Sequence, residues 1–261
     1  MRIALGLEYD GRGFCGWQSQ PRGCGVQDAL ESGLSVVAGS AVRVICAGRT
    51  DTGVHARAQV VHFDTDAVRP MNAWVRGTNT ALPPGIVALW AKCVPGTFHA
   101  RYSAVARKYT YLLLNRAVRA GLARGRVGWF HGPLDLPAMQ RAAALLVGTH
   151  DFTAFRSAEC QAKSPVRDLR EITLERYGEV IVIRFTANAY LHHMVRNLVG
   201  SLVYVGKGKH PAEWIEEVLK GRDRSRAAPT FAADGLYLSA VEYDSAWELP
   251  ITGHSLTLLE L

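Results

Sequence analysis

Apolar residues in the first hundred positions follow two different periods, which predict a strand, helix, strand, strand, helix, strand order. The stretch from Ile3 to Tyr9 is typical of a strand. Between Val26 and Val37 the apolar residues recur at the spacing of one helical face, and Gly39 is placed to end that helix. The remaining elements expected here are strands on either side of residues 47–56, a helix over 71–79 and a strand over 86–93.

The second half of the chain repeats this plan. Its expected elements are a strand at 109–114, a helix at 136–147, a hairpin of strands 169–177 and 180–187, helices at 190–204 and 211–219, and a strand at 236–241. Strands and helices mixed in this way, with hairpins, predict an α+β fold. We place the boundary between the halves near residue 105, which gives domains 1–105 and 106–261.

One turn, residues 47–56, carries a candidate for chemistry between two apolar stretches. Gly48 and Gly53 allow backbone angles that a side chain would forbid. Small neighbours leave room for another molecule to approach Asp51, and the guanidinium of Arg49 is two residues away. This arrangement favours a catalytic carboxylate. The alternative is structural, because Asp often bonds its own backbone in turns and Arg49 could be a surface ion-pair partner.

Composition points to a polyanionic partner. The chain has 261 residues, 48% of them apolar, and a net charge of +7. A basic balance favours nucleic acid. Any single surface cation is more often solvated than bound, but the basic residues gather in or beside turns, where we expect salt-sensitive contacts to RNA phosphates. They are Arg12, Arg22, Arg57, Arg101, Arg107, Lys108, Lys163, Arg167, Lys207 and Lys209.

The sequence predicts neither a metal site nor a membrane segment. Five cysteines at wide spacings show no metal-ligand pattern, so we interpret them as free thiols in a reducing cytoplasm. The adjacent His192 and His193 would point in different directions on a helix, which makes them a poor ligand pair. The glycine-rich runs at 11–13 and 206–208 match no nucleotide-binding loop.

The turn and several other segments resemble one enzyme family. Gly-Arg-Thr-Asp-Thr-Gly-Val-His-Ala at 48–56 is similar to the signature of the tRNA pseudouridine synthase A family, in which the Asp is the catalytic nucleophile. Further resemblance lies in residues 7–20, 98–104, 107–111, 194–202 and 228–236, in the family's order. Residues 188–193 depart from the pattern, because they replace an expected Gly-Phe-Leu run.

The resemblance implies a fold and a function. The fold is two similar, ferredoxin-like α/β halves joined through one mixed, mainly antiparallel sheet with a central cleft. The function is isomerisation of uridine to pseudouridine on the 3′ side of the anticodon stem-loop of tRNA. The family works as a homodimer, and the isomerisation needs no redox or group-transfer cofactor.

The resemblance also assigns roles to residues of this chain. Asp51 would attack the sugar or the base, or remove a sugar proton, and the sequence leaves these three routes open. Tyr109 would stack on the target base and assist proton transfer, with Tyr111, two residues along the strand, as a competitor or as core. Arg196 would pair with Asp51 and keep it ionised.

Substrate binding completes the set of expected roles. Leu236 would line the pocket by resemblance alone. RNA contacts are expected from Arg49, Arg12, Arg57 and Arg107. Two rival functions are a non-catalytic RNA-binding module and a glycosidase. The glycosidase needs two cooperating carboxylates, whereas the turn offers one acid.

Overall fold

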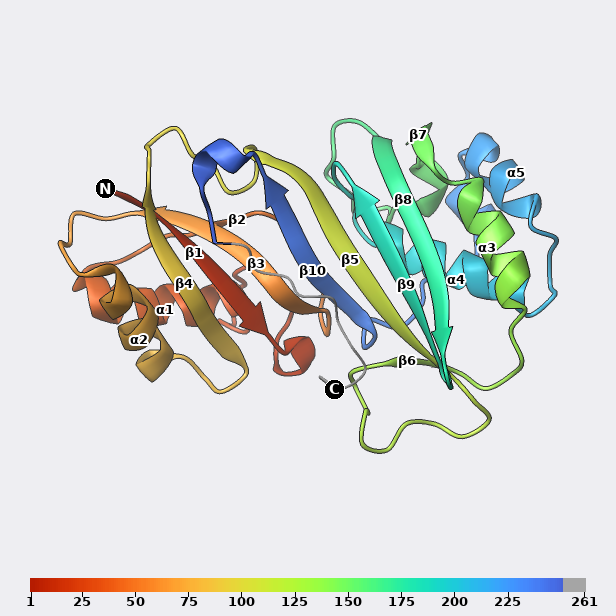
Figure 1. The fold of residues 1–261 in the computed structure, drawn as a ribbon, viewed down its shortest axis with the longest axis horizontal. Coiled ribbons are helices and arrows are strands. Elements are labelled where there is room, and N and C mark those ends of the chain that lie inside the picture. The colour runs from red at the N-terminus through yellow and green to blue at the C-terminus, as the bar shows by residue number, and fades with distance from the viewer. Residues whose placement is uncertain (251–261) are drawn as a thin grey trace. The chain divides into compact units, whose positions relative to one another are not determined.

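The computed structural model describes residues 1–250 and divides them into two compact units (Figure 1). The first consists of Met1–Arg107 with a C-terminal segment that begins at Tyr237, and the second of Lys108–Leu236. The sequence suggested a single boundary near residue 105, with everything beyond it in the second domain. The last strand instead belongs to the first unit, because the apolar pattern of a strand does not specify which sheet it joins.

The first unit is a mixed sheet with two helices. Its strands follow the order β4-β1-β3-β10, with β2 paired to β3. Strand β1 is antiparallel to both of its neighbours, whereas β10 runs parallel to β3. Helices α1 and α2 pack against each other. The elements are β1 (Arg2–Tyr9), α1 (Val26–Ala38), β2 (Ile45–Cys46), β3 (His55–Asp64), α2 (Met71–Ala81), β4 (Ile86–Val94) and β10 (Leu236–Tyr243).

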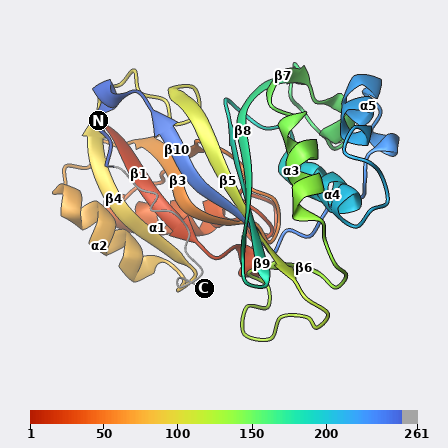
Figure 2. The same cartoon turned by 45° about the vertical axis from the view of Figure 1, so that its right-hand side comes forward.

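Within the second unit the strand order is β5-β9-β8-β7, with β6 paired in parallel to β5. The hairpin of β8 and β9 and the pairing of β7 with β8 are antiparallel. Helices α3, α4 and α5 gather on one side of this sheet (Figure 2). The elements are β5 (Ala104–Asn115), β6 (Gly128–Phe130), α3 (Leu136–Ala144), β7 (Gly148–Asp151), β8 (Val166–Tyr177), β9 (Val180–Ala187), α4 (Met194–Gly206) and α5 (Trp214–Gly221).

These elements confirm the α+β class. Helix α1 ends where expected, because Gly39 adopts the left-handed conformation that a side chain disfavours, at a φ of 71°. The hairpin turns at Gly178 for the same reason, at a φ of 58°. The start of α4 was predicted wrongly. The helix begins at Met194 rather than near residue 190, because His193 has a φ of 63° and cannot continue a helix backwards.

The prediction of five free thiols is also wrong, since Cys15 and Cys24 form a disulfide bond within the first unit. Their Cα atoms are 5.4 Å apart, and the Cys15 N–H donates to the Cys24 carbonyl over 2.9 Å. Cys46, Cys93 and Cys160 are free. Among residues 1–250, no helix is long and apolar enough to span a membrane.

A buried histidine in β3 couples stability of the first unit to pH. His62 is 2% exposed, and its Nδ1 accepts the Ala100 N–H over 3.1 Å. Burial lowers the pKa of His62 to about 4, and the nearby His99 acts in the same direction. The unfolded chain binds this proton at about pH 6.5. The contribution of neutral His62 to the free energy of unfolding is therefore fully present above pH 6.5. It is lost as the pH falls towards 4, because the unfolded chain then binds a proton that the folded chain does not.

We expect His62→Asn to remove this pH dependence, because the Asn amide oxygen can accept the Ala100 N–H without titrating. Between pH 7 and pH 4.5 the free energy of unfolding should fall by about 2 kcal/mol more in the wild type than in the variant. Urea unfolding at both pH values measures the difference. The exposed His131, changed to Asn, is the matched control and should behave like the wild type. Equal pH dependence in the wild type and His62→Asn would show that His62 titrates normally in the fold.

Candidate active site

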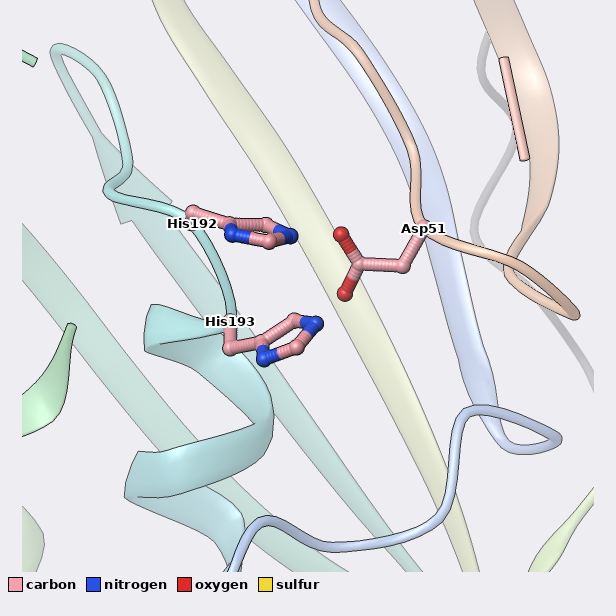
Figure 3. A group of neighbouring side chains, drawn as sticks. All are labelled: Asp51, His192 and His193. Carbon is pink, nitrogen blue, oxygen red and sulfur yellow. The ribbon is translucent and has the colours of Figure 1, made fainter. Parts of the chain in front are cut away.

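The Asp51 carboxylate lies on the loop that joins β2 to β3 (Figure 3). Asp51 is half-buried, and its carbonyl accepts the Val54 N–H over 3.1 Å to close a tight turn. Gly53 within this turn has a φ of 79°, a conformation that an L side chain rarely adopts. The turn therefore fixes the backbone at Asp51.

Buried polar side chains hold the loop from the sheet side. The Thr50 and Tyr9 hydroxyls are 2.8 Å apart. The Gln59 amide, fully buried on β3, donates to the Gly48 carbonyl over 2.6 Å and accepts the Gly48 N–H over 3.4 Å. Because each of these groups is buried and bonded, displacing the loop would leave polar atoms without partners. The segment before Asp51 is thus anchored to β1 through Thr50 and to β3 through Gly48.

A second segment, Gly16-Trp17, supports the loop from behind. The Trp17 N–H donates to the Thr50 carbonyl over 2.9 Å, and the Trp17 side chain is 1% exposed. Gly16 has a φ of 88°, and a Cβ there would lie 2.9 Å from the Thr50 oxygen and 3.1 Å from the Asp51 carbonyl carbon. Only glycine allows this approach. The segment 14–17, Phe-Cys-Gly-Trp, thus packs against the backbone of Thr50 and Asp51 and supports the loop.

The arginines expected to contact RNA have different surroundings. Arg49 is exposed and Arg57 is half-buried. Arg12 is exposed, and its Nε donates to both Asp10 carboxylate oxygens, over 3.0 and 2.9 Å. Burial alone would raise the pKa of Asp10, but the hydrogen bonds from Arg12 lower it below the usual value. Arg12 therefore already has an acidic partner.

Arg107, also expected to contact a phosphate, is buried, whereas Arg12 and Arg49 are exposed. Its side chain is buried at 9% exposure. The guanidinium donates to the Ala47 carbonyl over 3.0 Å and to the Ala104 carbonyl over 3.1 Å, and also to the Arg101 carbonyl. This arginine connects the segment before the Asp51 loop to the start of β5. These bonds give Arg107 a structural role within the first unit.

His55, the histidine of the same turn, is also structural. It is 3% exposed, and its Nδ1 accepts the Gly11 N–H over 3.1 Å. The ring stacks on Tyr237 of β10 with centroids 4.6 Å apart, and Nδ1 lies 3.3 Å from an Asp10 oxygen. His55 thus connects the N-terminal loop to the end of the Asp51 turn.

In the second unit, Tyr109 and Tyr111 of β5 are both buried, at 8% and 0% exposure. The Tyr111 hydroxyl donates to the Ala232 carbonyl over 2.9 Å, and burial raises the pKa of this phenol. A Cβ on Gly128 would lie 2.0 Å from that hydroxyl, so the glycine makes room for it. Tyr111 is therefore core. The Tyr109 ring meets Tyr190 edge to face, with centroids 5.0 Å apart.

Arg196 lies half-buried in the first turn of α4. Its Nε donates to the Phe231 carbonyl over 2.8 Å, and the Phe231 N–H donates back to the Arg196 carbonyl over 3.2 Å. This pair of bonds orients the guanidinium along the segment that leads to β10. Leu236, the first residue of β10, is 4% exposed.

Two histidines that the sequence interpretation set aside precede this helix (Figure 3). His192 and His193 are half-buried, with ring centroids 4.0 Å apart. They lie before α4 rather than on it, so the argument that helical geometry separates them does not apply. The departure of residues 188–193 from the family pattern is the sequence signal that could have indicated that these histidines lie outside the helix.

These features define an α+β protein with a carboxylate on a braced, glycine-containing loop. The family model described as "tRNA pseudouridine synthase" matches residues 7–103 and 142–244, which include Asp51 and Arg196. The chain belongs to the tRNA pseudouridine synthase family.

Curated relatives are similar over nearly their whole length, and each carries the name tRNA pseudouridine synthase A. The protein of Thiobacillus denitrificans is 60% identical over 96% of both chains. That of Methylobacillus flagellatus is 58% identical over 99% of both. A solved structure described as "Crystal Structure of a Cbf5-Nop10-Gar1 Complex" aligns with 86% of this chain and 60% of that one, at 11% identity and a TM-score of 0.35.

Proposed function

We propose that this protein isomerises uridine to pseudouridine in tRNA, with the Asp51 carboxylate as the group that acts on the uridine. The observation that carries the proposal is the match of the family model across the Asp51 loop. The support of this loop adds to the proposal, because Gln59 and Trp17 bond the backbone just before Asp51 and Gly16 lets a second segment pack closely against it. A preorganised group of this kind is what a nucleophile or base needs.

The reaction balances without any co-reactant. The bond between uracil N1 and ribose C1′ breaks, and a bond between C5 and C1′ forms. The proton on C5 leaves to solvent, and N1 gains one. Attack at the sugar, attack at the base and removal of a sugar proton all use an ionised carboxylate beside the glycosidic bond, which is the part we assign to Asp51.

We assign the supporting roles to Tyr109 and Arg196. A base removed from its stack needs a flat surface, and the Tyr109 ring offers one. An edge-to-face contact with the Tyr190 ring holds the Tyr109 ring in place. The Tyr109 hydroxyl is the proposed relay for the C5 proton. Arg196 is the proposed cation that keeps Asp51 ionised, and its guanidinium is oriented by the Phe231 carbonyl.

The substrate assignment rests on charge and on resemblance. The net charge of +7 favours a polyanion, and Arg49 and Arg57 flank the Asp51 turn. Uridines on the 3′ side of the anticodon stem-loop are the proposed targets. A homodimer working in the cytoplasm is part of the same proposal and rests on the resemblance to the tRNA pseudouridine synthase A family alone.

Mapping the modified positions tests this assignment. An unmodified tRNA transcript with uridines on the 3′ side of the anticodon stem-loop is incubated with the protein, treated with a carbodiimide that marks pseudouridine, and read by primer extension. We expect new stops at those uridines and at no others. A transcript with these uridines changed to cytidine is the control and should give none. Binding without any stop would favour the non-catalytic RNA-binding module, and stops elsewhere would refute the target region.

A further inference from the structure

The second unit contains a cavity of about 520 Å³ where α4 ends and α5 begins. One wall is formed by the aromatic side chains of Tyr204, His210 and Trp214 together with Lys209. The other wall is the segment 224–229, which contributes Arg224 and Arg226. All of these residues belong to Lys108–Leu236, so the cavity is complete within one unit.

The aromatic wall is a set of nearly parallel rings. His210 and Trp214 are stacked, with centroids 4.2 Å apart and planes 12° apart. Tyr204 lies beside both, at 6.2 Å from His210 and 6.5 Å from Trp214, with its plane within 24° of theirs. All three side chains are half-buried, so the apolar stack remains partly open to the cavity.

Two exposed lysines lie against the Tyr204 ring: Lys209, which lines the cavity, and Lys207, two residues before it. The Lys207 ammonium lies 4.0 Å and the Lys209 ammonium 4.3 Å from the centroid of the Tyr204 ring, which attracts both. Within residues 1–250 neither ammonium forms an ion pair. Two acids of the neighbouring helix and turn have other partners, since Glu216 pairs with Lys220 over 2.8 Å and Asp223 accepts from Ser225.

We propose that this cavity binds an unpaired nucleotide of the tRNA, with a phosphate at Lys207 and Lys209 and the base against the His210–Trp214 stack. The inference rests on the proposed function, which supplies the RNA. Lysines alone would suit any polyanion. Parallel rings beside them select a ligand that carries a flat base next to its phosphate, which is the combination that proteins use for single-stranded RNA.

The phosphate contact is tested with the double variant Lys207→Gln/Lys209→Gln. Equilibrium binding of an unmodified tRNA transcript is measured over a range of salt concentrations. Each lost contact to single-stranded RNA should reduce the slope of log affinity against log salt by about 0.7, hence by about 1.4 for the pair. The same exponents raise the Kd roughly tenfold or more at about 0.1 M salt. Lys220→Gln, which removes an exposed lysine of α5, is the matched control and should bind like the wild type.

The base contact is tested separately with His210→Ala. Loss of a stacking surface should raise the Kd roughly fivefold at every salt concentration and leave the slope unchanged. Wild-type affinity and slope in the double lysine variant would overturn the proposal, and an unchanged Kd in His210→Ala would overturn its base contact. Pseudouridine formation by the wild type is scored independently, so a failure of the cavity is distinguishable from a failure of the proposed function.

Discussion

Asp51→Asn should bind tRNA as the wild type does and form pseudouridine at least about a thousandfold more slowly, the order of loss seen when a nucleophilic group is removed. The substitution keeps the size of the side chain and removes its charge. The loop should keep its shape, because Thr50, Gln59 and Trp17 hold its backbone and Asn occupies nearly the same volume as Asp. Single-turnover rates with excess enzyme and equilibrium tRNA binding separate the two effects.

The exposed Asp66, changed to Asn, is the matched control for the loss of one negative charge from the first unit. It should leave both rate and affinity unchanged. If Asp51→Asn turned over at the rate of this control, Asp51 could not be the reacting carboxylate. Equal loss of binding and rate in Asp51→Asn would instead assign Asp51 to substrate binding.

Tyr109→Phe should bind tRNA normally and react at least about a hundredfold more slowly, the usual contribution of a positioned proton-transfer group. Phenylalanine keeps the ring that meets Tyr190 and loses only the hydroxyl. Tyr109→Ala loses both, and should also weaken binding by roughly 1 to 3 kcal/mol, the worth of a base-stacking ring. Single-turnover rates at saturating enzyme distinguish a relay from a simple platform.

Tyr111→Phe provides the control on the same strand. It removes a hydroxyl that donates to the Ala232 carbonyl, so it should cost about 1 kcal/mol of stability and leave the rate intact. Near wild-type turnover in Tyr109→Phe, with impaired binding in Tyr109→Ala, would show that the ring stacks and the hydroxyl does not relay the proton. Normal rates in both variants would place Tyr109 in the core.

Local elements of this fold could be predicted because their signals lie within a few residues. The apolar face of α1 and the left-handed Gly39 at its end are both contained in one short window. The β8–β9 hairpin likewise depends on Gly178 and on the alternation beside it. The parallel pairing of β10 with β3 could not be predicted in this way, since its partners are far apart in the sequence.

The same distinction applies to the site. The Asp51 turn could be predicted from its glycines and from the resemblance, but its supports could not. In the sequence Gln59 is only a polar residue in an apolar strand. The structure shows that its side-chain amide bonds the Gly48 carbonyl. Arg107 looks like a loop cation, whereas its partner, the Ala47 carbonyl, lies 60 residues away in the sequence. The sequence left Tyr111 as either a competitor of Tyr109 or a core residue. The hydrogen bond from its hydroxyl to the Ala232 carbonyl, 121 residues away, identifies it as core.

Release of tritium from tRNA carrying 5-tritiated uridine tests the central claim most directly, because C5 loses its hydrogen only when the new bond to C1′ forms. The wild type should release tritium to water in step with pseudouridine formed, one atom for each uridine converted. Asp51→Asn should release none above the rate without enzyme, while still retaining the RNA on a filter. Release by Asp51→Asn at the wild-type rate, or none by the wild type, would contradict the account.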